Sequence, residues 1–532
     1  MKIKFLFGKN SIKVATYILV VTLFISNILG VLRDHFLAQK IPTDLLDTYF
    51  AAFRIPDFIF NILILGAISA AFIPIFSSLL VENKDEKALK IANTIISTGF
   101  VVILLACAIL YFIMPYLIPF LTPHFSQDKI NTTISISRLL LLSPLIFSLS
   151  YSFSGILNSY KKFLITSLAP LIYNLFIILG TILFSDRYGV YGPVIGVIVG
   201  AFFHMLIQLF PLYKMGLKIS INVNFFDPIV KRVIKLMIPR SIGLGANHIL
   251  LIVFTAIASG LEKGAISMYS LADNIQTMPT VVFGTSVATA LFPTLSQAVS
   301  LNKVVDITQH LQKAILSILY YLIPISVAVI LLRIQLVRLI LGSGHFGWEQ
   351  TILTADTLGL FAVSLVFSGL IPLFAKTFYA YKDTKTPTYI SIVSIIVSIT
   401  GAIILTKKMD VMGLALAFSV GSFINASLLF YFLNHKIEVI SKKIIFTQGF
   451  KIIIASIFMA IAIQWAKTYV GIAFDLRYGS EVLLQFIFAS SVGLITYFIM
   501  TWVINLPPEK YKPLLILQLL LKLTQNVRRN KN

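Results

Sequence analysis

Runs of about 20 apolar residues recur along the whole chain, and each is long enough to cross a bilayer as a helix. Hydrophobic residues make up 58% of the 532 residues and charged residues only 12%, against roughly 25% charge in a typical soluble domain. Because an unpaired backbone amide is costly in lipid, we expect an all-α integral membrane protein. The predicted spans lie near residues 14–39, 45–81, 91–114, 131–159, 163–184, 190–213, 236–258, 265–297, 309–332, 352–380, 387–406, 411–433, 449–472 and 482–505.

The basic residues indicate how the chain crosses the membrane. If the N-terminus is cytoplasmic, the connections on the cytoplasmic side carry most of the 43 Lys and Arg residues, including Lys161, Lys162, Arg528 and Arg529. Cytoplasmic loops are enriched in these residues, so we expect both termini in the cytoplasm. The net charge of +22 is spread over many short loops without an aromatic-basic cluster, which favours contact with anionic lipid headgroups and argues against a nucleic-acid partner.

The chain contains a weak internal repeat. AISAAFIPIFSS, starting at Ala67, matches SVATALFPTLSQ, starting at Ser286, and Gly192 and Gly200 fall on Gly413 and Gly421 at nearly the same offset. Each copy contains six predicted spans, an even number, so the two copies are expected to have the same orientation, as in several transporter families. The predicted parts are an N-lobe at 1–220, a C-lobe at 221–434, and two further spans with a basic cytoplasmic tail at 435–532.

Polar and ionisable residues concentrate in the first two spans of each predicted lobe. Such residues are expensive in lipid and usually face an aqueous cavity or each other, so we expect these spans to surround a central cavity. Arg33 and Arg54 would make this cavity positive, and the planar guanidinium suits a phosphate. A purely structural alternative pairs Arg54 with Asp57 or Asp47, and Asp34 with Arg33. The predicted substrate-binding residues are Ser26, Asn27, Arg33, Asp34, Asp47, Arg54, Asn61, Arg240, Asp273 and Asn274.

Motifs of common enzymes are missing from the sequence. It has no GxxxxGK[ST] phosphate loop, no HExxH metal motif and no GxSxG elbow, and the lone Cys107 excludes an intrachain disulfide and a cysteine-based metal site. These features predict a transporter and not an enzyme, without a cofactor or metal. We expect transport to be driven by a gradient of H⁺ or Na⁺, or by the membrane potential, and the protein to be a monomer.

Several motifs resemble the MurJ/MviN family of lipid II flippases, which belongs to the MOP exporter superfamily. The strongest are SNILGVLRD at 26–34, DTYFAAFRIP at 47–56 and GAISAAFIP at 66–74, and weaker matches include FPTLS at 292–296 and DTKTP at 383–387. The resemblance implies a two-lobe flippase of the bacterial inner membrane that moves a polyprenyl-pyrophosphate-linked glycan, lipid II, to the outer leaflet for peptidoglycan synthesis by alternating access. It also implies that the last two spans form a groove for the polyprenyl tail.

The same resemblance assigns roles to individual residues. Arg33 matches the family's cavity arginine in a Gly-x-x-Arg-Asp motif, and Asp34 and Asp47 match acidic positions. Well-studied members carry arginines at the positions of Asn27, Phe60 and Asn274, so this cavity is expected to be less positive. The alternatives are export of another lipid-linked oligosaccharide, a MATE-like small-molecule antiporter, and a membrane enzyme acting on polyprenyl-phosphate sugars, which would need a large catalytic loop that the sequence lacks.

Overall fold

The computed structural model describes residues 12–65, 72, 76, 80, 85–215, 220–437, 442–474 and 478–506, and within these ranges the side chains of 12–20, 85–87, 236, 238–240, 242–244, 246–247 and 442 are not described. The described residues form helices joined by short connections, and no strand occurs among them. This confirms the predicted all-α class. The chain divides into two compact units, Met1–Ser267 and Met268–Asn532.

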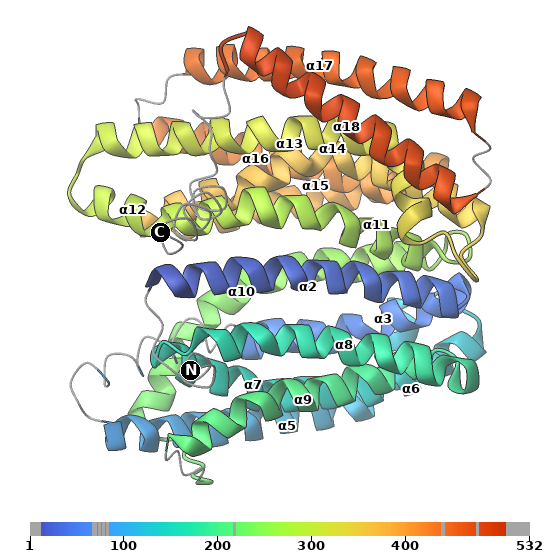
Figure 1. Cartoon of the computed structure of the whole chain (residues 1–532). Coiled ribbons are helices and arrows are strands. Elements are labelled where there is room, and N and C mark those ends of the chain that lie inside the picture. The colour runs from blue at the N-terminus through green and yellow to red at the C-terminus, as the bar shows by residue number, and fades with distance from the viewer. Residues whose placement is uncertain are drawn as a thin grey trace, which may run out of the picture. The chain divides into compact units, whose positions relative to one another are not determined.

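The helices follow the apolar runs closely (Figure 1). The first unit contains α2 (Ile12–Lys40), α3 (Thr43–Ile59), the π-helix η1 (Phe60–Leu65), α5 (Asp85–Leu121), α6 (Gln127–Leu140), α7 (Leu142–Ser159), α8 (Phe163–Tyr188), α9 (Tyr191–Lys214) and α10 (Pro228–Ala258). Helix α11 (Ala265–Pro279) contains the unit boundary. It is followed by the π-helix η3 (Thr280–Thr285), α12 (Ser286–Ser300), α13 (Val304–Ile340), α14 (Trp348–Ala380), α15 (Lys385–Met409), α16 (Val411–Ile437), α17 (Lys442–Ala473) and α18 (Gly479–Val503).

Thirteen helical segments of the described chain are long and apolar enough to cross a membrane. They correspond to thirteen of the fourteen predicted spans. The remaining one, predicted at 236–258, lies within the 31-residue helix α10, of which only His248–Ala258 counts as an apolar helix among the described residues.

The second and eighth spans each contain a short π-helix close to a proline. η1 begins four residues after Pro56, and η3 begins directly after Pro279. Proline removes a backbone donor and disturbs the turn before it, and a π-helical turn is a common way for a helix to absorb this change. A further proline of the eighth span, Pro293, lies inside α12.

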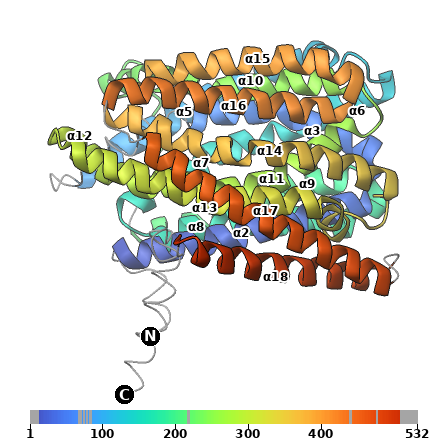
Figure 2. The same cartoon turned by 90° about the horizontal axis from the view of Figure 1, so that it is seen from above.

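The internal repeat is visible in the local geometry of each unit. Lys161 and Lys382 both adopt a positive φ, of 61° and 58°, in the turn that precedes α8 and α15 respectively. Gly192 packs on Ser185 of α8, and Gly413 packs in the same way on Thr406 of α15. The helix pair α15 and α16 lies side by side in Figure 2, and α8 and α9 form the matching pair in the first unit. These correspondences confirm the repeat that the sequence predicted.

The last two helices belong to the second unit. α17 and α18 run alongside each other and pack on α13 (Figure 1). Buried hydrogen bonds stabilise this packing. The Tyr497 hydroxyl donates to the backbone oxygen of Tyr320 at 2.7 Å, and the Gln335 amide nitrogen donates to the side-chain oxygen of Gln485 at 2.7 Å. The two C-terminal helices are therefore an integral part of the second unit and not a loose appendage.

Candidate functional site

Arg33 lies on α2 and is the most firmly placed of the predicted site residues. Its Nε and one terminal nitrogen donate to the same oxygen of Asp34, at 3.0 and 2.8 Å, and the other terminal nitrogen donates to Asn174 Oδ1 on α8 at 3.3 Å. Asp34 is buried, whereas the Arg33 side chain remains 24% exposed. Asp34 therefore neutralises the charge of the guanidinium from one edge. The other edge makes only a long hydrogen bond, to the uncharged side-chain amide of Asn174.

Two further predicted residues precede Arg33 on α2. Ser26 and Asn27 are both half-buried, and Asn27 Nδ2 is a buried donor that has no acceptor among the described residues. A buried donor without an acceptor is uncommon in native structures and often marks a place where water or a ligand completes the site. Asn27 thus offers an unused hydrogen-bond donor to an anionic ligand.

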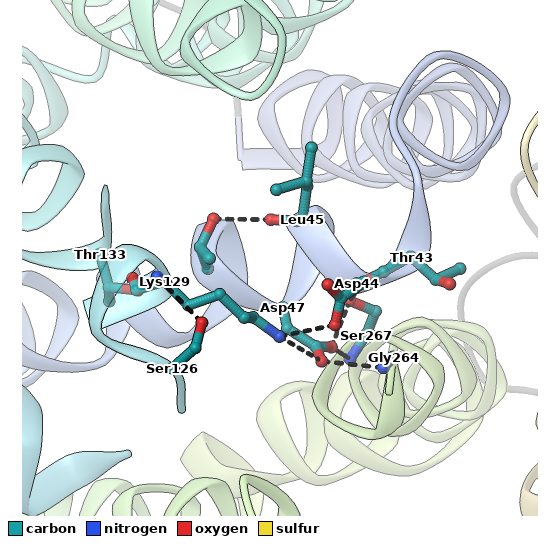
Figure 3. Close-up of polar contacts among 10 residues, drawn as sticks. Thr43, Asp44, Leu45, Asp47, Ser126, Lys129, Thr133, Gly264 and Ser267 are labelled. Carbon is teal, nitrogen blue, oxygen red and sulfur yellow. Dashed lines mark hydrogen bonds and ion pairs between the residues drawn. The ribbon is translucent and has the colours of Figure 1, made fainter. Parts of the chain in front are cut away.

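Asp47 caps the start of α11 from another helix (Figure 3). Its Oδ1 accepts from the backbone N–H and the hydroxyl of Ser267, both at 2.8 Å, and its Oδ2 accepts from the backbone N–H of Gly264 at 2.9 Å. The first amides of a helix carry partial positive charge and have no partner within the helix, so a carboxylate stabilises them. Asp47 is only 3% exposed, and its contacts make it a helix-capping residue in this structure.

The Asp47 cluster also contains residues that were not predicted from the sequence. Lys129 at the start of α6 donates to Asp44 at 2.8 Å and lies 3.6 Å from Asp47 Oδ2. Gly264 adopts φ +88°, and a Cβ there would lie 3.0 Å from Thr43, so this turn requires glycine. Ser267 and Asp47 are far apart in the sequence, so their contact could not be predicted. The one sequence signal for a helix start here is Gly264 followed by Ser267 ahead of an apolar run.

Arg54 and Asn61 lie on α3 and η1. Arg54 Nε donates to the Thr255 hydroxyl of α10 at 2.8 Å, and the Asn61 amide donates to the backbone oxygen of Asp57 at 2.9 Å. Within the described residues no ion pair joins Arg54 to Asp47 or Asp57. The structural alternative that pairs Arg54 with Asp57 or Asp47 is therefore not formed as a direct ion pair in this structure, whereas the predicted Arg33–Asp34 pair is confirmed.

The remaining predicted residues lie on α10 and α11. Asp273 and Asn274 are half-buried on α11, and Asp273 Oδ1 accepts from the Gln276 amide at 2.8 Å. Arg240 lies within α10, but its side chain is outside the described residues. The structure thus brings Arg33 and Asp34 into contact and ties Asp47 to α11, and the role of the whole set in substrate binding stays a prediction.

A sizeable cavity of the described structure is lined by none of the ten predicted residues. It measures about 770 Å³ and is formed by α5, α6 and α7, with mostly apolar walls and Arg138 among its lining residues. Arg138 Nε donates to the backbone oxygen of Tyr111 at 3.0 Å, and its guanidinium lies over the Tyr111 ring. This intramembrane arginine is therefore held by local contacts.

Comparison with known proteins identifies relatives along most of the chain. The family model described as "Lipid II flippase MurJ" matches residues 42–504. A "Probable lipid II flippase MurJ" of Buchnera aphidicola subsp. Schizaphis graminum is 30% identical over 444 residues, which cover 82% of this chain and 86% of the relative. The protein of the same description from Rickettsia prowazekii is 28% identical over 459 residues, covering 84% of this chain and 88% of the relative.

Solved structures agree with the sequence relatives. A structure described as "Lipid II flippase MurJ, inward closed conformation" has a TM-score of 0.76 and 25% identity, and the match covers 92% of this chain and 99% of that one. An inward-facing multidrug resistance MATE family transporter of the MOP superfamily has a TM-score of 0.67 at 15% identity, covering 80% and 99%, and supports the fold alone. Because the family model matches residues 42–504, which is most of the length of this chain, the chain belongs to the MurJ family of lipid II flippases.

Proposed function

We propose that this protein moves lipid II, a polyprenyl-pyrophosphate-linked glycan precursor, from the inner to the outer leaflet of the bacterial inner membrane for peptidoglycan synthesis. The observation that carries this proposal is the family match over residues 42–504. As a member of a flippase family the chain is a multi-pass transporter and not an enzyme. The thirteen apolar helical segments found among the described residues agree with that role.

The geometry around Arg33 supports binding of the pyrophosphate. A guanidinium donates pairs of parallel hydrogen bonds to phosphate oxygens, and it stays charged even when it is partly buried. The Arg33 edge that faces Asn174 is held at 3.3 Å by an uncharged acceptor, which an anionic oxygen would outcompete. We assign the pyrophosphate contact to Arg33, assisted by Arg54 and Arg240, with the remaining predicted polar residues around the headgroup: Ser26, Asn27, Asp34, Asp47, Asn61, Asp273 and Asn274.

The transport cycle is proposed to be alternating access between the N-lobe, 1–220, and the C-lobe, 221–434. A ligand that binds the two states differently shifts their populations, and net transport needs a driving force such as a gradient of H⁺ or Na⁺ or the membrane potential. We further propose that α17 and α18 hold the polyprenyl tail, that the monomer is the working unit, and that anionic lipids contact the basic loops. The excess of cytoplasmic Lys and Arg supports placing both termini in the cytoplasm.

The proposal is tested by depleting this protein in its own cells and measuring how much lipid II reaches the outer leaflet. We expect lipid II to accumulate in the inner leaflet while its total amount is maintained or rises. If no related protein is present and lipid II still reaches the outer leaflet at the normal rate, the proposal is wrong. Accumulation of a different lipid-linked glycan would instead support a changed headgroup, for which the uncharged residues at Asn27, Phe60 and Asn274 leave room.

Arg33→Ala is the variant that tests the site. A charge-assisted hydrogen bond contributes about 1.5–3 kcal/mol, so losing the arginine should reduce lipid II flipping by at least roughly tenfold. Arg138→Ala is the matched control, because it also removes a half-buried arginine from a membrane span, yet within the described structure Arg138 is held by its hydrogen bond to the backbone of Tyr111 and by the Tyr111 ring. Both variants are measured in the depleted cells at equal protein level. Equal rescue by the two variants would contradict the role of Arg33.

A further inference from the structure

A small cavity inside the first unit lies beside a carboxylate that the proposed site does not use. The cavity measures about 170 Å³, enough for a few water molecules. Asp57, Tyr151, Tyr173 and His204 line it, together with Ser143. These residues come from α3, α7, α8 and α9, so four membrane-spanning helices surround the space. The cavity therefore combines room for water with groups that can carry or relay a proton.

The Asp57 carboxylate lacks the partners that usually hold a charge within a membrane protein. It is half-buried, and no described residue donates a hydrogen bond to it. The neighbouring Arg54 directs its Nε to Thr255. By contrast, buried Asp34 and Asp47 each accept at least two hydrogen bonds or ion pairs. Because a carboxylate in lipid is expensive unless it is paired, Asp57 is the acidic group of this region that can most readily take up a proton.

Two positive charges lie near Asp57. Arg54 and Arg33 are both within electrostatic range of its carboxylate, so the charge state of Asp57 affects both guanidinium groups. The titratable and charged groups in electrostatic range of this cluster are Arg33 and Asp34 on α2, Tyr49 and Arg54 on α3, Tyr151 on α7, Tyr173 on α8, His204 on α9 and His248 on α10.

His204 is held in a fixed position at the wall of the cavity. Its Nδ1 lies 2.6 Å from the Ser150 hydroxyl, the Gln208 amide donates to the same hydroxyl at 2.8 Å, and the Tyr151 ring stacks on the imidazole at 5.6 Å between centroids. The imidazole is 3% exposed. The imidazole and the side chains of Tyr151 and Tyr173 thus line the same water-sized space as Asp57.

We propose that Asp57 is a proton-binding site and that its protonation strengthens binding of an anionic pyrophosphate at Arg33 and Arg54. Protonation removes one negative charge from the neighbourhood of both guanidinium groups, so their attraction for an anion increases. Linkage is reciprocal: if a proton favours the anion, binding of the anion favours the proton. This inference rests on the proposed function, because it takes the pyrophosphate of lipid II as the ligand.

The test measures lipid II binding to the full-length protein in nanodiscs between pH 5.5 and pH 8. For wild type, the affinity should rise as the pH falls, by up to about tenfold per pH unit for one linked proton. Asp57→Asn imitates the protonated group in shape and charge. It should therefore bind more tightly than wild type at pH 8 and show little dependence on pH, whereas Asp57→Glu should restore the dependence. A gain in affinity cannot result from misfolding. Any ionisation of the lipid itself affects wild type and variants equally, so it does not contribute to the difference between them.

The outcomes separate this inference from the proposed function. If lipid II does not bind at any pH, the proposed function fails. If lipid II binds with a pH dependence that is the same in wild type and Asp57→Asn, the role of Asp57 fails while the flippase proposal stands. The titration is repeated with Na⁺ replaced by K⁺ at constant ionic strength, and a change in the wild-type curve would identify Na⁺ and not H⁺ as the bound cation.

Discussion

Asp47 shows how one buried carboxylate can hold a helix start that lies far away in the sequence. It accepts from the backbone N–H groups of Gly264 and Ser267, two amides that α11 cannot satisfy itself, and from the Ser267 hydroxyl. Hydrogen bonds to a charged group contribute about 1.5–3 kcal/mol each, and a buried donor that loses its acceptor carries a similar cost. Asp47 is therefore expected to stabilise the fold, in addition to any contact that it makes with substrate.

Asp47→Asn should lower the stability of the purified protein by about 2–3 kcal/mol, because the amide presents only one acceptor to three donors. The measurement is the apparent unfolding temperature in detergent. Asp44→Asn is the matched control, since Asp44 is 39% exposed and pairs with the same Lys129. An exposed pair is worth at most about 1 kcal/mol, so its effect should be small. Equal losses in the two variants would contradict the capping role.

Sequence and structure agree best at residues whose partners are close in the chain. The Arg33–Asp34 pair could be predicted because the residues are adjacent, and the Gly192 and Gly413 positions could be predicted because the repeat aligns them. Asn174, Lys129 and Ser267 could not be predicted, because each owes its role to a contact that exists only after helices distant in sequence have packed.

At the scale of elements, glycines set how closely neighbouring helices approach. A Cβ at Gly196 on α9 would lie 2.5 Å from the backbone oxygen of Phe176 and 2.8 Å from the Cα of Ile177 on α8. Both contacts are to backbone, which cannot rotate away, so the helices would have to separate. Small residues at membrane helix interfaces serve this close approach, and the second unit repeats it at Gly413 on α16.

Gly196→Ala should therefore destabilise the protein by about 1–3 kcal/mol, the usual cost of overpacking. Gly99→Ala is the control on α5, where the added Cβ meets nothing within 4 Å and alanine favours the helix by up to about 1 kcal/mol. Apparent unfolding temperatures of the two variants should move in opposite directions. A stabilised Gly196→Ala protein would show that the α8–α9 pair is less tightly packed than the structure has it.

Asp383 ties the start of α15 to the end of α16. Its carboxylate accepts from the backbone N–H and hydroxyl of Thr386, at 3.1 and 3.0 Å, and from Lys436 at 2.9 Å. Burial acts to raise the pKa of Asp383, but the hydrogen bonds from Lys436 and Thr386 outweigh it and hold the pKa below its ordinary value. A lowered pKa in the folded state means that the ionised form stabilises the fold.

The stability that Asp383 contributes should be complete above the pKa of an unfolded aspartate, about 3.9, and should be lost as the pH falls through the lower pKa of the folded state. Asp383→Asn should thus be less stable than wild type at pH 6, and the difference should shrink towards zero below about pH 4. The experiment compares apparent unfolding temperatures over this pH range. A difference that grew as the pH fell would reverse the sign of the argument and exclude a stabilising carboxylate.

For the whole molecule, the positions of the helices could be predicted from the apolar length that a bilayer requires, whereas their local irregularities could not. The length of an apolar span follows from the bilayer thickness, so thirteen of the fourteen predicted spans are found as long apolar helices in the described part of the chain. The π-helices η1 and η3 could not be foreseen as such, because a proline shows that a bend is needed and not how the backbone makes it. The break between α6 and α7 at Leu141 likewise interrupts a run that reads as one span.

The orientation of the whole chain is the prediction that depends most on charge. The chain has a single cysteine, Cys107, which is buried, so Cys107→Ser gives a cysteine-free protein with little change in volume. Single cysteines are then introduced as Lys303→Cys, before α13, and His345→Cys, between α13 and α14, at two exposed positions. If the N-terminus is cytoplasmic, these positions face opposite sides of the membrane, with His345 outside.

A membrane-impermeant maleimide added to cells with a permeable outer membrane should label His345→Cys at once and Lys303→Cys only after the inner membrane is opened. The cysteine-free parent controls for background labelling, and a permeant maleimide confirms that both thiols react. The reverse pattern would place the basic loops outside and contradict the predicted orientation. It would not affect the assignment of the helices or of the internal repeat. Because α13 connects the two positions, labelling of both from outside would instead show that α13 does not cross the membrane.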